Sequence, residues 1–190
     1  MDAALQEKAA WIVRKLHEVG KRQQAQTPLA IRWSDGMELP YLGRTIMLRL
    51  DRRQPRSAGP VWDAAGETLW LPFGTDATPA QLQRATQRWM QEQALVLFNQ
   101  RLAHFAPQLG VRWSSLLLSN ARTRWGSAKA DGTVRLHWRL LQFRPGVIDY
   151  VVVHELSHLR VMNHSPAFWD TVQSVLPDYA ALRRELKQER

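Results

Sequence analysis

Residues 151–169, VVVHELSHLRVMNHSPAFW, place three side chains capable of acid–base and metal chemistry in an otherwise apolar run. On a helix, residues four apart lie on one face, so His154 and His158 can share one ion. Glu155 lies about 100° further round the axis, where it can reach a water on that ion without binding the ion itself. This is the HExxH arrangement, in which two imidazoles bind zinc and the carboxylate takes a proton from zinc-bound water.

The alternative to a metal site is a pair of buried, hydrogen-bonded histidines. Val151–Val153, Leu156 and Leu159 predict that the helix is largely buried. Three adjacent polar groups in such a helix need a strong common partner, because burying them unpaired is costly. A divalent cation supplies that partner, so we expect a metal site.

A catalytic zinc has three protein ligands, and His164 is the nearest candidate for the third, in the spacing HExxH-x5-H. On a continuous helix the ten residues from His154 would point His164 away, so the helix must break. Asn163 is expected to provide the break in a left-handed conformation, and Ser165-Pro166 to begin a new helix over 166–176. The other candidate third ligands are Asp170, Asp178 and Glu185.

The helices and strands that position these groups can be predicted from the periodicity of apolar residues and from the residue types that start helices and form turns. Pro145 is expected to begin the HExxH helix, and Thr78-Pro79 to open a long helix that ends near Phe105, before Pro107. An amphipathic helix is expected over 3–19, followed by a polar linker. Strands are expected at 29–33, at 38–50 with a turn near Gly43, at 61–73 with a turn near Ala65-Gly66, at 114–120 and at 133–140.

Composition narrows the class of protein. The 190 residues contain no cysteine, which excludes disulfides and thiolate metal sites. The N-terminus does not resemble a signal peptide and no apolar run reaches the roughly 20 residues of a membrane helix. We therefore expect a cytoplasmic protein without a membrane partner. The net charge of +9 is compatible with nucleic acid or phosphorylated ligands, but also with an ordinary solvated surface.

The chain resembles the YgjP-like metallopeptidase family, relatives of the SprT-like and WLM zinc peptidases. The resemblance is carried by RTRWGSAKADGTVRLHWRL (122–140), DYVVVHELSHL (149–159) and NHSPAFW (163–169), and is expected to cover residues 29–189. It implies an α+β, minimal zincin-like fold: a small twisted β-sheet, a long backing helix and an HExxH helix. It also implies one zinc ion on His154, His158 and His164, with Glu155 as base.

The expected organisation is an N-terminal helix and linker at 1–28, outside the resemblance, and a zincin domain at 29–190. That domain divides into a β-rich part at 29–75 and a catalytic part at 76–190. The family often has Cys where this chain has Ala128, and Asn where it has His137. Neither departure touches the expected ligands.

Zinc-dependent hydrolysis of a peptide or protein substrate is the main hypothesis. Candidates for the donor that stabilises the oxyanion are Arg124, His137, Tyr150 and Tyr179. An edge strand beside the active helix should pair with extended peptide, and either 133–140 or 114–120 would serve.

Two other functions remain open. The resemblance also suggests metal-dependent nucleoside triphosphate hydrolysis, because Arg122, Arg124 and Lys129 flank a Gly-Ser turn that could bind an anion. A DNA-associated protease is the third hypothesis, motivated by the net charge and by the SprT and WLM kinship.

Overall fold

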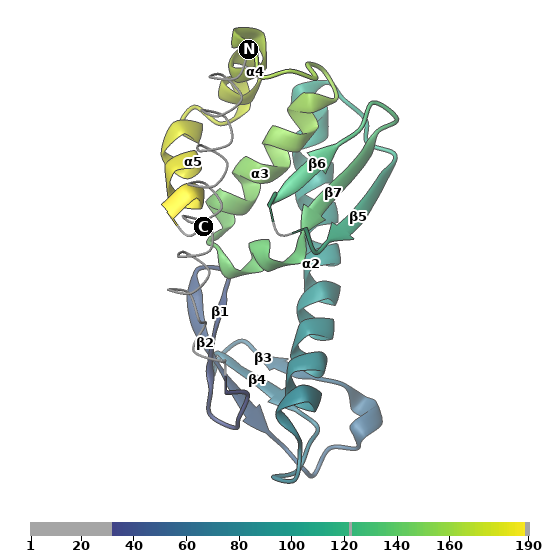
Figure 1. Ribbon diagram of the computed structural model, residues 1–190, viewed down its shortest axis with the longest axis vertical. Helices are drawn as coiled ribbons and strands as arrows, with labels where there is room; N and C mark the ends of the chain where they lie inside the picture. Colours follow the sequence, from purple (N-terminus) through teal and green to yellow (C-terminus); the bar gives the residue numbers. More distant parts are fainter. Residues whose placement is uncertain (1–31, 122, 189–190) are drawn as a thin grey trace, which may run out of the picture. The chain divides into compact units, whose positions relative to one another are not determined.

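Two small β-sheets and four helices form the part of the chain described by the computed structural model, residues 32–121 and 123–188 (Figure 1). The predicted helix at 3–19, most of the strand predicted at 29–33, and Arg122 lie outside the described residues. The α+β class is confirmed. The strands form two separate small sheets.

The first sheet has four strands in the order β1-β2-β4-β3. They are β1 (Glu38–Tyr41), β2 (Arg44–Leu50), β3 (Val61–Asp63) and β4 (Thr68–Leu71), with a 3-10 turn, η1 (Arg56–Ala58), before β3. The central pair β2–β4 is parallel and the two outer pairs are antiparallel. The turns predicted near Gly43 and Ala65-Gly66 therefore fall where expected.

The helix α2 (Pro79–Leu109) is the long helix of the fold. Its start is as predicted: the Thr78 hydroxyl accepts from the Gln81 N–H, and the Gln81 side chain accepts from the Thr78 N–H. The predicted end at Phe105 is wrong. The helix continues past Pro107 to Gly110, which is left-handed, because Phe105, Ala106 and Leu109 are buried and packing outweighs the proline.

The second sheet has three strands in the order β5-β7-β6. They are β5 (Ser115–Ser119), β6 (Gly126–Ala128) and β7 (Thr133–His137). Strand β7 pairs parallel with β5 and antiparallel with β6. The prediction that 133–140 could be a substrate-pairing edge is wrong, because β7 is central and residues Trp138–Gln142 form the 3-10 helix η2. The edge strand next to the HExxH helix is β6, which the sequence did not predict (Figure 1).

Three helices complete the fold: α3 (Pro145–His158), α4 (Pro166–Val175) and α5 (Tyr179–Gln188). Helix α3 begins at Pro145 as predicted and packs against α2, β6, α4 and α5. Its apolar residues, including Val147, Ile148, Val152 and Leu156, are fully buried. The HExxH residues are thus held on a helix surrounded by protein.

Two contacts fix α3 at its N-terminal half. The Arg101 guanidinium of α2 donates two hydrogen bonds to the Asp149 carboxylate, at 2.6 and 2.8 Å. At the first turn, the β1–β2 hairpin tip lies against Arg144: a Cβ on Gly43 would stand 2.6 Å from the Arg144 Cβ. The Leu42 N–H also donates to the Leu141 carbonyl at 2.6 Å.

Candidate metal centre

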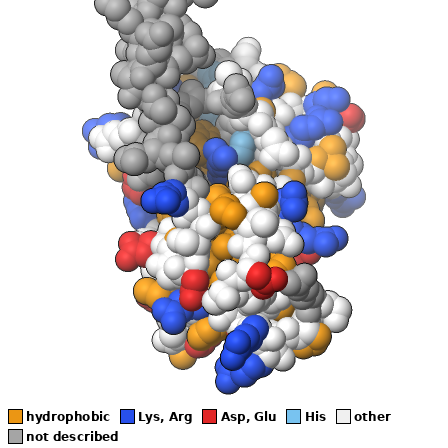
Figure 2. Space-filling view, turned by 60° about the horizontal axis from the view of Figure 1, so that its bottom comes forward, with side chains coloured by type: hydrophobic (Ala, Val, Ile, Leu, Met, Phe, Trp, Pro, Cys, Tyr) orange, Lys and Arg blue, Asp and Glu red, His pale blue; other side chains and the backbone are white. Residues whose placement is uncertain are grey.

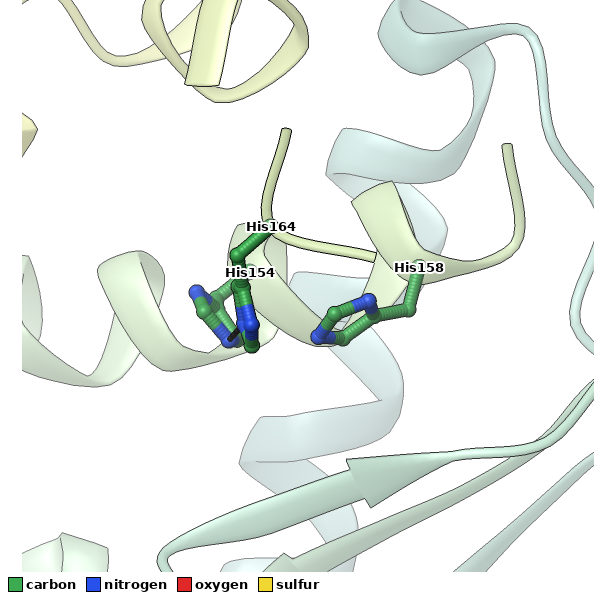
Figure 3. Close-up of side chains that lie close together, drawn as sticks. All are labelled: His154, His158 and His164. Atoms are coloured by element: carbon green, nitrogen blue, oxygen red, sulfur yellow. Dashed lines mark hydrogen bonds between the residues drawn. The ribbon is translucent and has the colours of Figure 1, made fainter. Parts of the chain in front are cut away.

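Three histidine side chains converge at the C-terminal end of α3 (Figure 3). One ring nitrogen from each of His154, His158 and His164 lies within 4.8 Å of the others. The Nε2 atoms of His154 and His164 are 3.1 Å apart. Two tetrahedral zinc ligands, each at about 2.0–2.1 Å from the ion, stand roughly 3.3 Å apart, so the spacing fits a shared ion.

The hydrogen bonding of His158 also fits a ligand. Its Nδ1 lies 3.2 Å from the Val161 carbonyl oxygen. A carbonyl can only accept, so Nδ1 carries the proton and Nε2 has a free lone pair. Metal-binding histidines are commonly oriented by such a bond to a backbone carbonyl.

The chain between His158 and His164 turns as the third ligand requires, but by a different device from the one predicted. Helix α3 ends at His158, so the predicted break is present. Asn163 does not adopt a left-handed conformation. Instead its side-chain oxygen accepts from the Ser165 N–H at 3.2 Å, immediately before Pro166 begins α4.

Aromatic rings pack against the exposed side chain of His164. The ring of Trp169 stacks on that of His164, with centroids 5.7 Å apart and planes at 22°. The ring of Tyr179 also stacks on Trp169, with centroids 5.3 Å apart. The Arg183 guanidinium lies 4.6 Å from the Trp169 ring centre. The sequence NHSPAFW (163–169) predicts that Trp169 packs behind the site, whereas Arg183 was not predicted, because no local motif marks it.

Glu155 is 5% exposed and lies against strand β6. Burial raises the pKa of Glu155 to about 8, and the charge of Arg124 opposes that rise. Burial lowers the pKa of His154 to about 3, with the charges of His158, His164 and Arg183 acting in the same direction. The site thus favours neutral imidazoles and a carboxyl group with a raised proton affinity.

Of the other predicted site residues, some lie beside His154 and Glu155 and others do not. Arg124 and Tyr150 line a hollow of about 190 Å³ together with His154 and Glu155. Tyr150 is buried, its ring lies 5.8 Å from that of His154, and burial raises its pKa to about 12. His137 lines a different hollow, and Tyr179 is separated from His164 by Trp169. Arg122 lies outside the described residues.

The carboxylates weighed as third ligands do not join the three histidines among the residues described. Glu185 forms an ion pair with Arg144 at 2.6 Å, and Asp170 and Asp178 are exposed. His137 also departs from expectation. In residues 133–140, Arg135, His137 and Arg139 alternate with apolar residues, which predicts a polar face, but His137 is 8% exposed and packs edge-on against Trp125.

Two histidines and a buried glutamate on one helix, with a third histidine beyond its end, form an arrangement typical of metal-dependent hydrolases. The family model described as "YgjP-like, metallopeptidase domain" matches residues 1–189. The chain belongs to the YgjP-like metallopeptidase family, and it is accordingly a hydrolase of the zinc metallopeptidase class. The match begins at residue 1, so the expectation that the first 28 residues fall outside the resemblance is wrong.

Two solved structures are similar over about half of this chain. One is the metallopeptidase zymogen of abylysin from Pyrococcus abyssi, with 21% identity and a TM-score of 0.45 over 48% of this chain and 93% of that one. The other is the metallopeptidase zymogen of jannalysin from Methanocaldococcus jannaschii, with 16% identity and a TM-score of 0.43 over 48% and 95%. No curated protein matches the chain.

Family membership supports peptides as substrates and gives no support to nucleotides or nucleic acid. On the face in Figure 2, Lys and Arg side chains are interspersed with acidic and hydrophobic ones and are not gathered in one stripe. Within 32–121 and 123–188, no helix combines the length and the apolar character that crossing a membrane requires.

Proposed function

We propose that this chain is a peptidase with one zinc ion held by the Nε2 atoms of His154, His158 and His164, and with Glu155 as general base. The observation that carries the proposal is the convergence of the three imidazoles, two of them 3.1 Å apart at Nε2. Zinc in such a site lowers the pKa of a water ligand and polarises a substrate carbonyl.

Glu155 is the group that handles the proton. It lines the same hollow as His154 and lies against Gly126 of β6. Burial raises the pKa of Glu155 above that of an exposed carboxyl, and a stronger base suits a group that accepts a proton from the attacking water and passes it to the leaving amine. Arg124 lines this hollow too, and we assign it to the oxyanion because its charge lies near Glu155.

Strand β6 offers an edge to an extended peptide. The Trp125 carbonyl accepts from the His137 N–H at 2.8 Å, and the Lys129 N–H donates to Thr133 at 3.0 Å, so alternate residues of this strand bond to β7. The residues between them, Gly126 and Ala128, direct their N–H and C=O groups to the opposite edge. A substrate strand pairing there would pass beside Glu155.

The proposal is tested by zinc content and peptide hydrolysis in the wild type and in two variants. Glu155→Gln should bind one zinc per chain and lose hydrolysis by about 10²–10⁴-fold. His154→Ala should lose both zinc and activity. Glu92→Gln, an exposed glutamate on α2, is the matched control and should behave as wild type. Purification without metal, together with unchanged activity in His154→Ala, would contradict the proposal.

A further inference from the structure

A second hollow, lined by Asn120, Arg124, His137 and Arg139 among others, adjoins the proposed active site. Its volume is about 440 Å³, within the range of ligand-binding sites. Arg124 and Trp125 line both this hollow and the smaller one that contains Glu155. A ligand in the second hollow can therefore be continuous with a peptide at the catalytic centre.

Hydrogen bonds already present leave donors facing the second hollow. The Trp138 indole N–H donates to Asn120 Oδ1 at 2.6 Å, which leaves the Asn120 NH₂ group available. The Arg139 backbone N–H donates to His137 Nδ1 at 3.1 Å, so the His137 proton resides on Nε2. Burial and the nearby Arg139 lower the pKa of His137, which keeps the ring neutral in this tautomer. The one acceptor of the His137 ring is thus used, and the Asn120 oxygen already accepts one hydrogen bond.

The charged side chains that line the second hollow are all positive. Arg124 and Arg139 line it, and no carboxylate does so among the described residues. The Arg139 guanidinium lies 5.4 Å from the Trp138 ring centre, a stacking contact that leaves its edge donors free. Neither arginine has an ion-pair partner within the described part of the chain. Hydrogen-bond donors and positive charge, with amides but no carboxylate in the lining, suit a carboxylate ligand.

We propose that the second hollow binds an acidic side chain of the peptide substrate, and so makes the enzyme selective for Asp or Glu near the scissile bond. This inference rests on the proposed peptidase function, because it takes the chain that enters the hollow to be the chain that is cleaved. Arg139 is the distinguishing residue, since it lines the second hollow and not the one around Glu155.

Cleavage is measured on zinc-loaded enzyme with fluorescence-quenched peptides that carry Asp, Asn or Lys at each position flanking the cleaved bond. At one position Asp should exceed Asn in kcat/KM by about tenfold, the value of a hydrogen bond to a charged group. In Arg139→Gln this ratio should fall to about one. Arg139→Lys should retain part of it, and Arg112→Gln, an exposed arginine outside both hollows, should keep it.

Binding is measured separately, by fluorescence anisotropy of the same peptides on zinc-loaded Glu155→Gln. The Asp peptide should bind about tenfold more tightly than the Asn peptide, and adding Arg139→Gln should abolish the difference. A nucleoside triphosphate is included as competitor, because phosphate shares the chemistry of a carboxylate.

The outcomes separate the two proposals. Cleavage without charge preference, or a preference that survives Arg139→Gln, overturns the acidic subsite and leaves the peptidase proposal standing. Arg139-dependent binding of the Asp peptide with no cleavage by the wild type supports the subsite and overturns the peptidase proposal. Arg139-dependent displacement by a nucleoside triphosphate at lower concentration than any acidic peptide overturns the peptide assignment.

Discussion

Gly126 of β6 lies so close to Glu155 of α3 that a Cβ at Gly126 would stand 2.5 Å from Glu155 Oε1 and 2.7 Å from its Cγ. Real Cβ atoms do not approach other atoms so closely, and the neighbour here is a buried side chain with little room to move. Only glycine allows the strand and the proposed base to meet at this distance. Gly126 is therefore a positioning residue for Glu155.

Gly126→Ala should lower kcat/KM for peptide hydrolysis by about 100-fold, because displacing a reacting group by about 1 Å has an effect of that size. Its zinc content, measured by atomic absorption, should stay at the wild-type level, since no ligand is touched. Gly146→Ala is the matched control on α3, because its new Cβ would meet only the outer ends of the Arg144 and Leu182 side chains, at 2.9 and 3.4 Å, and neither residue belongs to the proposed site. Equal activity in Gly126→Ala and wild type would show that Glu155 does not depend on this contact.

The metal-free protein should lose stability as pH rises from 6.5 to 8. The pKa of Glu155 is raised from 4.5 to about 8 on folding. The protonated carboxyl therefore adds to the free energy of unfolding fully below pH 4.5, and this stabilisation is lost as pH rises through 8. The pKa of His154 falls from 6.5 to about 3, so its opposite contribution is complete above 6.5. We expect a net loss of about 1 kcal/mol of unfolding free energy across this window.

Urea unfolding in the presence of a chelator, at pH 6.5 and pH 8, measures this loss. Glu155→Gln should remove most of it, because the amide does not titrate. A wild-type stability that is flat or that rises between these values would contradict the assigned environment of Glu155.

Trp169→Leu should weaken zinc binding by about 10–100-fold, the effect usual for residues that orient a metal ligand. The leucine loses the ring that stacks on the exposed ligand His164. Competition with a chromophoric chelator measures the affinity. Trp62→Leu, in the first sheet, is the control and should leave zinc affinity within about twofold while lowering stability. Similar zinc affinities in the two variants would remove the assigned role of Trp169.

Asp149→Asn should destabilise the protein by about 2 kcal/mol, because it leaves the half-buried Arg101 without its carboxylate. Urea unfolding of the zinc-loaded protein is the measurement. The exposed pair Arg88–Glu92 provides the comparison, and Glu92→Gln should change stability by less than about 0.5 kcal/mol. A larger effect of Glu92→Gln than of Asp149→Asn would reverse this ranking.

Local signals allowed much of the candidate site to be predicted from the sequence. His154, Glu155 and His158 share one helix, so their spacing alone places them, and Pro145 marks where that helix begins. Thr78 and Pro79 likewise mark the start of α2. These predictions depend on interactions within one helix. Residues that interact within a helix are close in the sequence, so their spacing can be read from it directly.

Contacts between distant segments could not be predicted in the same way. Strand β6 has the sequence Gly-Ser-Ala, which lacks strand propensity and forms only by pairing with β7. The continuation of α2 past Pro107 depends on the burial of Leu109. Arg139 faces a hollow whose other walls come from α2 and from the loop after β5, so no spacing in the sequence marks it.

The contact between Gly43 and Arg144 makes a surface hairpin part of the alignment of the HExxH helix. Turns usually tolerate changes in length during evolution. At this one, an added residue or a side chain would press on the residue just before α3, ten positions ahead of His154. The hairpin tip should therefore vary less during evolution than the rest of the first sheet, although it contains no catalytic or metal-binding residue.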